Sequence, residues 1–192
     1  MILCGVDEVG RGSLAGPVIS VAYCCNDDMD LSIAKDSKAI THKKRLLLSE
    51  FFKKISIEWS FGIVSSFVID KINIHHASLL SMKIALKNLA SNPDMVYVDG
   101  KFIPETTFNA QSVISGDKII PVISIASIIA KVFRDNIMIN YSKVFSNYLF
   151  EKNFRYGTKG HLDLLKVHGL SKIHRKTFKP CEILTKSDFY SN

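Results

Sequence analysis

The sequence has no apolar run long enough to cross a membrane. No stretch reaches the roughly 20 uncharged apolar residues that a transmembrane helix needs, and the first residues lack the basic start and long apolar core of a secretion signal. Internal repeats and low-complexity linkers are also missing. At 192 residues and 47% hydrophobic content, the chain suits one core better than two. We therefore expect a single domain over residues 1–192, in a monomeric, cytoplasmic protein without a membrane partner.

Cysteine is scarce and poorly spaced for cross-linking or for zinc. A disulfide framework or a structural zinc site needs several cysteines at regular, paired positions. The four cysteines of this chain do not follow such a pattern: Cys4, Cys24, Cys25 and Cys181. We therefore expect free, buried thiols.

Positive charge is plentiful and unevenly distributed. The formal net charge is +7, and from Glu151 to Asn192 nine Lys or Arg stand against four Asp or Glu, so this segment carries +5 of the total. A basic segment of this kind indicates a polyanionic partner, most often a nucleic acid. Within the segment, His174 and Arg175 can be interpreted as phosphate contacts or as plain surface charge.

Apolar patterns predict a mixed α/β organisation. Strands are predicted where short apolar runs are bounded by turn residues: Ile2–Val6, Pro17–Cys25, Glu58–Ser65 and Met95–Gly100. Helices are predicted where apolar residues recur at helical spacing: after Thr41 as N-cap, over Leu79–Leu89, over Ile125–Val132, and from Thr158 as N-cap to Gly169 just past the end.

Four acids fall at the ends of these predicted apolar elements. Asp7 and Glu8 follow the first strand, Asp99 closes the strand before Gly100, and Asp135 follows the apolar part of a helix. Each alone could be a solvated turn residue, but clustered carboxylates repel one another unless cations neutralise them. Hard divalent ions with oxygen ligands suit that role, Mg²⁺ or Mn²⁺ first. Two such ions about 4 Å apart can activate a water and stabilise the leaving oxygen in phosphodiester cleavage.

The glycines after the first two acids indicate an unusual turn. Neighbouring residues of an ideal strand point to opposite faces, so Asp7 and Glu8 reach one cluster only if the strand ends or twists, or if they serve different positions. Glycines from Gly10 onward permit that change, because they allow positive φ. They also expose backbone N–H groups that can hydrogen-bond a phosphate or a ribose hydroxyl.

At this point the sequence resembles the type 2 ribonuclease H family, ribonuclease HII. The segment "GVDEVGRGSLAGPV" (Gly5–Val18) is similar to the N-terminal signature of that family. Further short motifs follow in the family's order: "DSK" at Asp36–Lys38, "DG" at Asp99–Gly100, "GDK" at Gly116–Lys118, "SIIAKVFRD" at Ser127–Asp135, "YGTKGH" at Tyr156–His161 and "HR" at His174–Arg175. Each piece is weak alone, but the ordered set is specific.

The resemblance implies an α/β protein with an RNase H-like fold, a mixed central sheet flanked by helices. We also expect a helical C-terminal segment, which the charge count makes basic from about residue 151. It implies that the divalent-metal site is formed by the acids Asp7, Glu8, Asp99 and Asp135. It also implies substrate-binding roles for Gly10, Arg11, Gly12, Lys38 and Tyr156. In this reading the turn Gly10–Gly12 lies near the ribose 2′-hydroxyl, Lys38 contacts a phosphate and Tyr156 stacks on the next sugar.

The activity that the resemblance implies is cleavage on the 5′ side of a ribonucleotide, leaving 3′-hydroxyl and 5′-phosphate ends. The expected partners are RNA/DNA hybrids and duplex DNA with embedded ribonucleotides, which connects the chain to replication and ribonucleotide excision repair. One departure from the family weakens the role of Tyr156: Arg155 stands where the family usually has glycine. Contact between the C-terminal end and a sliding clamp is left open.

Three other interpretations stay open. Ribonuclease HIII shares the fold and the Asp–Glu start, but the "GRG" at Gly10–Gly12 and the absence of an N-terminal substrate-binding domain argue against it. Resolvase- or transposase-type nucleases place their acids at other spacings. A non-catalytic nucleic-acid-binding protein on the same scaffold gains nothing from four acids beside a polyanion.

Overall fold

The protein is built around one five-stranded mixed sheet. The computed structural model describes residues 1–34, 41–151 and 157–189. Within these residues the strand order is β3-β2-β1-β4-β5, with β1 antiparallel to β2 and parallel to β4. The strands are β1 (Ile2–Val9), β2 (Val18–Asn26), β3 (Glu58–Val64), β4 (Met95–Asp99) and β5 (Ala110–Val113).

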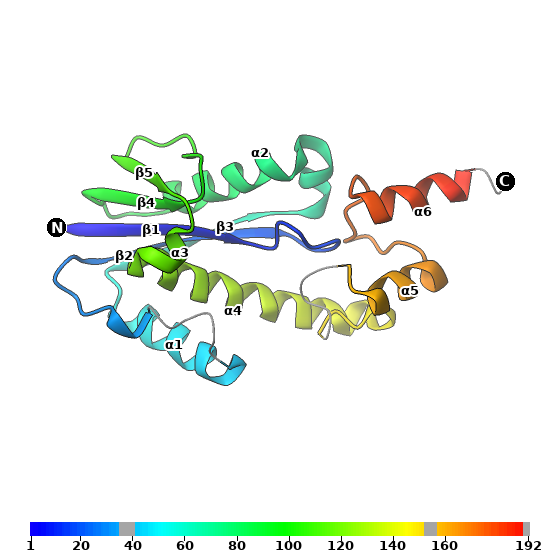
Figure 1. Ribbon diagram of the computed structural model, residues 1–192, viewed down its shortest axis with the longest axis horizontal. Coiled ribbons are helices and arrows are strands. Elements are labelled where there is room, and N and C mark those ends of the chain that lie inside the picture. The colour runs from blue at the N-terminus through cyan, green and yellow to red at the C-terminus, as the bar shows by residue number, and fades with distance from the viewer. Residues whose placement is uncertain (35–40, 152–156, 190–192) are drawn as a thin grey trace.

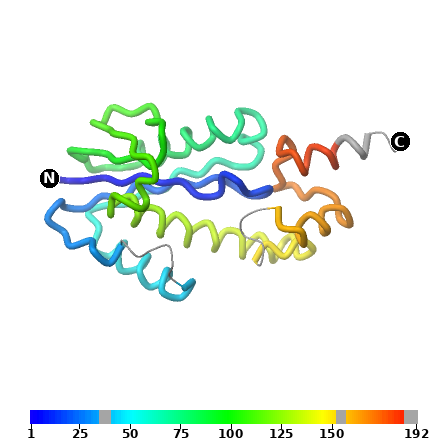
Figure 2. Tube along the Cα trace, viewed as in Figure 1, coloured from blue at the N-terminus to red at the C-terminus, as the bar shows by residue number. Residues whose placement is uncertain are grey.

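Helices cover both faces of this sheet (Figure 1). Helix α2 lies on one face, and α4 and α1 lie on the other, while α5 and α6 extend beyond one end of the sheet. The helices are α1 (His42–Ile55), α2 (Ser66–Lys87), α3 (Gly116–Ile119), α4 (Pro121–Val144), α5 (Lys159–His168) and α6 (Lys179–Phe189), with short 3₁₀ turns at Ser32–Ala34 and Ser146–Tyr148. The trace in Figure 2 places the N-terminus and the C-terminal helix at opposite ends of the molecule.

Side chains of β1 point alternately to the two faces of the sheet, and this explains how helices pack on both faces. Cys4 and Val6 belong to the core beneath α2, whereas Val21 and Tyr23 of the neighbouring strand belong to the core beneath α4. Gly5 lies on the α4 side, where a Cβ would overlap the backbone of Val122. Helix α4 therefore packs directly on the middle of β1 and runs along it.

A third core joins the C-terminal segment to the rest of the molecule. Its buried side chains come from the turn after β1, from α4, from the Ser146–Tyr148 turn and the residues after it, and from α5 and α6: Leu14, Ala15, Met138, Tyr148, Phe150, Leu165 and Cys181. The expectation of a helical C-terminal segment is confirmed for the described residues. All four cysteines are free and buried, as predicted, and none of the helices described is long and apolar enough to cross a membrane.

Local sequence signals located several helix ends correctly. Thr41 and Thr158 are N-caps whose side-chain oxygens accept hydrogen bonds from Lys44 N and His161 N, and Gly169 is the C-cap of α5. Other boundaries were wrong. Strand β1 continues to Val9, and α2 begins at Ser66 with a break at Asn73, whose φ is 63°.

Candidate active site

The parallel pairing of β1 and β4 brings two acids side by side. The register pairs Val6 with Val98, so Asp7 and Asp99 follow at the same edge of the sheet. Both lie on the α4 side, since strand side chains alternate and Val6 and Val98 point toward α2. Asp7 and Asp99 are therefore neighbours, as expected for a metal site.

The strand does not end at Asp7, contrary to one expectation. Asp7 and Glu8 remain paired with Val21 and Ser20 of β2, and β1 ends only at Val9. The antiparallel hairpin with β2 keeps the backbone extended, while the parallel partner β4 has already ended at Asp99. The acids thus lie inside β1, with Asp7 level with the last residue of β4 and Glu8 just beyond it.

Asp7 is a strongly buried carboxylate, with 6% of its surface exposed. Burial raises its pKa well above the ordinary value, and the negative charges of Glu8 and Asp99 raise it further. Hydrogen bonds from Ser127 of α4 and from the Glu8 backbone, 2.7 Å to Asp7 Oδ1, oppose this shift. The side chain is held in place by donors, yet its negative charge is poorly compensated.

The Glu8 side chain points to the opposite face of β1 from Asp7, but nearby charges, including that of Asp99, also shift its pKa. Burial raises its pKa, the nearby Arg11 guanidinium lowers it, and the charge of Asp99 raises it. Arg11 Nη1 lies 3.2 Å from Glu8 Oε1, and the Arg11 side chain is 49% exposed. Asp99 thus acts electrostatically on both Asp7 and Glu8, and these three carboxylates are called the carboxylate cluster below.

A fourth acid, Asp117, lies beside Asp99 and was missed in the sequence-based assignment. Its backbone N–H donates to Asp99 Oδ1 at 3.3 Å, and its carbonyl accepts a hydrogen bond from Ser124 of α4. Helix α3 is a single short turn, so Asp117 is fixed by these two contacts at the start of α4. The "GDK" motif at Gly116–Lys118, already part of the resemblance, was the signal that could have indicated it.

Asp135 occupies a different environment from the other acids. It is buried in the interior of α4, not at the end of an element, and both of its carboxylate oxygens lie 2.8 Å from Lys131 Nζ. It follows Ser127, the partner of Asp7, by eight residues, which is roughly 12 Å along a helix. The structure therefore joins Asp135 to Lys131 and does not bring it into the cluster around Asp7.

The cluster has the donors that a hard divalent ion requires, although it is not a closed cage. Among the described residues no three acidic, cysteine or histidine side chains are placed so that together they could hold a metal ion. Mg²⁺ normally keeps several waters and uses one or two carboxylates together with substrate phosphates, so a closed protein cage is not needed. The oxygen donors of Asp7, Glu8 and Asp99 and the poorly compensated charge of Asp7 fit Mg²⁺ or Mn²⁺.

The glycine-rich turn follows directly after the acids. Gly10 and Gly16 have φ values of 93° and 78°, which other residues rarely adopt. A Cβ at Gly10 would also overlap the side chain of Arg134. Two other expected substrate contacts, Lys38 and Tyr156, lie outside the described residues, as does Arg155.

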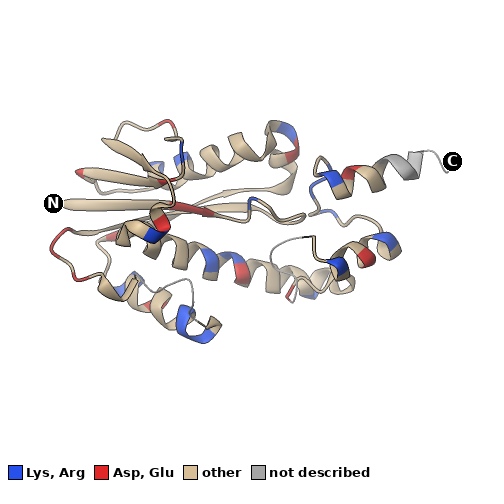
Figure 3. Cartoon of the chain, in the orientation of Figure 1, with Lys and Arg blue, Asp and Glu red and all other residues tan. Residues whose placement is uncertain are grey.

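Two residues of the basic C-terminal segment are not at the surface, contrary to both interpretations of them. Arg175 is 0% and His174 2% exposed. His174 Nδ1 accepts from Ser171 N at 2.9 Å, and its Nε2 lies 3.1 Å from Nε2 of the buried His161. Charge in this segment is therefore divided between exposed lysines and a buried arginine. Figure 3 shows Lys and Arg together in blue along this part of the chain.

Comparison with known proteins shows the family of this chain. The family model for Ribonuclease HII matches residues 4–181. The chain belongs to the ribonuclease HII family. A ribonuclease HII of Pelagibacter ubique (strain HTCC1062) is 50% identical over 180 residues, covering 93% of this chain and 96% of the relative. A ribonuclease HII of Borrelia hermsii (strain HS1 / DAH) is 47% identical, covering 93% and 99%. The chain is thus an endonuclease of the ribonuclease H class.

Solved structures share the fold along nearly the whole chain. Ribonuclease H2 from Pyrococcus horikoshii OT3 has a TM-score of 0.87 at 22% identity, with full coverage of both chains (100% of each). Ribonuclease HII from Archaeoglobus fulgidus, solved with PCNA, has a TM-score of 0.79 at 24% identity, covering 93% and 96%. Bst-RNase HIII, solved with Mn²⁺, has a TM-score of 0.73 at 13% identity, covering 97% of this chain and 70% of that one. The RNase H-like fold is confirmed, and family membership favours ribonuclease HII over ribonuclease HIII.

Proposed function

We propose that this member of the ribonuclease HII family hydrolyses the phosphodiester bond 5′ to a ribonucleotide, in RNA/DNA hybrids and in duplex DNA with embedded ribonucleotides. The products carry 3′-hydroxyl and 5′-phosphate ends. The observation that supports this most directly is the carboxylate cluster at the end of β4, directly followed in sequence by the glycine-rich turn. One part can hold metal ions at the scissile phosphate, while the other can contact the adjacent sugar.

The metal-binding residues in this proposal are Asp7, Glu8, Asp99 and Asp117. Two divalent ions bound there would supply an activated water and neutralise charge on the leaving oxygen. Ser127 orients the Asp7 carboxylate, and the Asp117 backbone N–H orients that of Asp99. The burial that raises the pKa of Asp7 and Glu8 also keeps competing water away and strengthens their interaction with a cation. The Mn²⁺ present in the structure of the related Bst-RNase HIII is consistent with a hard divalent ion.

Asp117, rather than Asp135, is the fourth acid in this proposal. The backbone N–H of Asp117 donates to the Asp99 carboxylate, so Asp117 lies beside it, whereas Asp135 pairs with Lys131 within α4. Asp135 then has a structural role in stabilising α4 beside the turn.

Recognition of the ribonucleotide is assigned to the turn Gly10–Gly12. The 2′-hydroxyl distinguishes RNA from DNA at a given position, and it is both a donor and an acceptor. Backbone groups of the turn can contact it without side-chain interference, and the exposed part of Arg11 can reach a phosphate. The exposed lysines of the C-terminal segment provide sequence-independent attraction to the duplex.

The proposal is tested by mapping the cut in a labelled DNA duplex that carries one ribonucleotide. With Mg²⁺ or Mn²⁺, the expected product ends in a 3′-hydroxyl immediately 5′ to the ribonucleotide, and the matched all-DNA duplex stays intact. Excess EDTA should stop the reaction. Cleavage at the 3′ side, cleavage of the all-DNA duplex at a similar rate, or full activity in EDTA would each contradict it.

A further inference from the structure

Two arginines lie buried beneath the glycine-rich turn. Arg134 of α4 and Arg175 of the C-terminal segment are 1% and 0% exposed, and they are among the largest fully buried side chains described. Burying a guanidinium is costly unless its donors are satisfied. Where their hydrogen bonds go therefore indicates what these side chains do.

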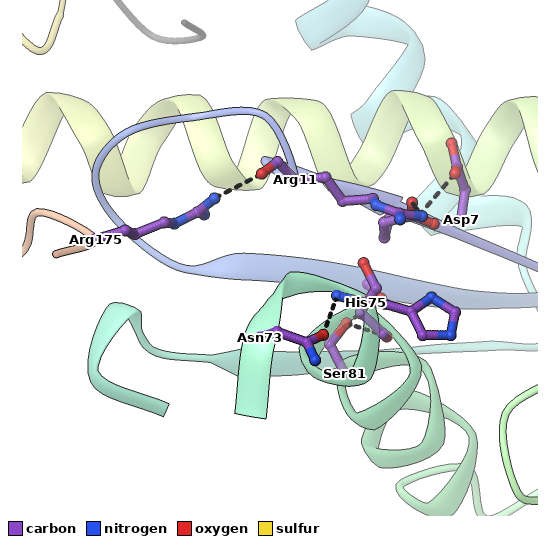
Figure 4. A network of polar contacts seen from close by, with 9 residues as sticks. Asp7, Arg11, Asn73, His75, Ser81 and Arg175 are labelled. Carbon is purple, nitrogen blue, oxygen red and sulfur yellow. Dashed lines mark hydrogen bonds and ion pairs between the residues drawn. The ribbon is translucent and has the colours of Figure 1, made fainter. Parts of the chain in front are cut away.

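Arg175 joins the two ends of the turn. Its Nη1 donates to the carbonyl of Arg11 at 2.8 Å, while Nε and Nη2 donate to the carbonyl of Gly16 at 3.1 and 2.9 Å. The contact with Arg11 is drawn in Figure 4. A planar guanidinium presents donors in a rigid fork, so it can bridge two separate carbonyls with little loss of freedom.

The backbone around Arg175 is fixed to the same turn. Gly16 N donates to Ile173 O at 2.9 Å, Arg175 N donates to Leu14 O at 2.8 Å, and Ala15 forms an antiparallel bridge with His174. The segment therefore acts as a short extra strand along residues 14–16. It brings the guanidinium to a defined position under the turn.

Arg134 supports the other side of the turn. Its Nε and Nη2 donate to the carbonyls of Pro17 at 3.3 Å and Ala15 at 3.1 Å, and its side chain lies against Gly10. Together the two arginines hold four carbonyls toward the protein interior. Because C=O and N–H of one trans peptide unit point in opposite directions, the Arg11 carbonyl held by Arg175 directs the Gly12 N–H away from the interior.

We propose that Arg175 is a positioning residue for ribonucleotide recognition, whose guanidinium fixes the Arg11–Gly12 peptide so that the Gly12 N–H faces the ribose 2′-hydroxyl. This inference rests on the proposed function, in which the turn reads the sugar. Arg175 itself touches neither the substrate nor the metal site. It acts only through the carbonyls of the turn.

The chemistry of Arg175 is specific to arginine. Burial, and secondarily the charge of Arg134, lower its pKa to about 9, so it is still protonated at neutral pH. Lysine would keep the positive charge, but its single ammonium cannot reproduce the planar fork to Arg11 and Gly16. Arg175→Lys therefore keeps the positive charge but removes the hydrogen-bond geometry, so the two contributions can be measured separately.

The test compares wild type, Arg175→Lys and a stability control, Phe52→Leu, in the core between α1 and the sheet. Affinity is measured by fluorescence anisotropy for a DNA duplex with one ribonucleotide and for the same all-DNA duplex, with Ca²⁺ in place of Mg²⁺ and intact substrate verified on a gel. Cleavage of the ribonucleotide duplex is measured separately with Mg²⁺. Thermal unfolding with and without Mg²⁺ reports folding and metal binding for each variant.

We expect Arg175→Lys to lose at least tenfold in cleavage and most of the affinity ratio between the two duplexes. Its affinity for the all-DNA duplex should stay within about twofold, and Mg²⁺ should still raise its melting temperature. Phe52→Leu should lower the melting temperature and keep the wild-type ratio. If Arg175→Lys keeps the wild-type ratio, the inference is wrong and the proposed function stands. If it loses the ratio only to the extent that Phe52→Leu does, the role is merely structural and the inference is also wrong. A wild-type ratio of one would instead contradict recognition of the sugar in the proposed function, and the inference with it.

Discussion

The carboxylate cluster and the buried arginines beneath the glycine-rich turn are neighbouring regions that differ in how their buried charge is compensated. In the carboxylate cluster, Asp7 and Glu8 are buried beside Asp99, and burial together with mutual repulsion raises the pKa of both. Beneath the glycine-rich turn, the guanidinium of Arg175 donates hydrogen bonds to the backbone carbonyls of Gly16 and Arg11. The first region stores unfavourable electrostatic energy that a cation can relieve. The second is satisfied within the protein and gains rigidity.

This difference separates ligand binding from positioning. An unsatisfied cluster is a site for an added ligand, because the ligand removes the cost of burial. A satisfied cluster needs no ligand, and its value lies in the geometry that it imposes on the adjacent backbone.

Asp7→Asn should have the largest effect on activity. The variant removes one carboxylate from the metal site, and we expect cleavage to fall by about 10³-fold or more. Without metal its melting temperature should rise, because a buried and repelled charge is gone, and the increase that Mg²⁺ produces in wild type should shrink. The measurements are single-turnover cleavage and thermal unfolding in EDTA and in Mg²⁺. A metal-free variant less stable than wild type would contradict this account of the cluster.

Asp117→Asn and Asp135→Asn form a matched pair that defines the fourth acid. Asp117→Asn should reduce cleavage by roughly 10²-fold or more while leaving stability nearly unchanged, as expected for loss of one interaction made in the transition state. Asp135→Asn should keep cleavage within a few fold but lower stability by about 2 kcal/mol, because Lys131 loses a buried partner. Cleavage rates and urea unfolding distinguish the two. The reverse pattern would return Asp135 to the metal site.

The position of three of the acids could be predicted because it depends on local signals. Short apolar runs ending in a carboxylate identified Asp7, Glu8 and Asp99, and threonine caps located the starts of α1 and α5. The extension of β1 to Val9 was not predictable in the same way. It depends on pairing with β2 across the turn, and β1 continues beyond the end of its parallel neighbour β4.

The contacts of the buried arginines with the glycine-rich turn could not be predicted from the sequence, for a physical reason. Arg175 contacts Gly16 across 159 positions of sequence, and a run of basic residues normally indicates a solvated surface. Nothing local distinguishes the buried Arg175 from the exposed Lys172 and Lys176. Asp117 was passed over because it lies in a one-turn helix with no apolar periodicity, whereas Asp135 ends a clear helical pattern.

Gly10→Ala tests whether the turn depends on the close contact between Gly10 and the Arg134 side chain. Gly10 has a φ of 93°, and an added methyl would meet the Arg134 side chain. We expect a loss of about 1–3 kcal/mol in stability and a roughly tenfold loss in cleavage. Gly160→Ala is the control, since nothing lies within 4 Å of that position in α5 and alanine favours a helix. Equal effects of the two substitutions on cleavage would show that the turn does not depend on its contact with Arg134.

The buried histidine pair predicts a loss of stability in acid. Burial lowers the pKa of both His161 and His174, to about 4 for His174, with the charge of His161 a second cause there. Because the unfolded state binds protons near pH 6.5 and the folded histidines resist protonation, stability should fall as the pH drops below 6.5, with His174 alone contributing a loss of about 1 kcal/mol at pH 5.5. His174→Gln should flatten this dependence in urea titrations between pH 7.5 and 5. An equally steep profile in the variant would assign the effect to other groups.

The smallest predicted effect separates exposed from buried positive charge. Lys172 and Lys176 are exposed, whereas Arg175 is buried, so only the lysines can displace counterions from a nearby duplex. Lys172→Gln and Lys176→Gln should each weaken duplex binding a few fold and reduce the slope of log K against log salt by about one. Arg175→Lys should leave the slope unchanged, because its charge never reaches the phosphates. Lys54→Gln, at the end of α1, is the control for net charge alone. If Lys54→Gln flattens the slope as much as the other two lysine substitutions, the C-terminal segment makes no specific phosphate contacts and contributes only to the overall field.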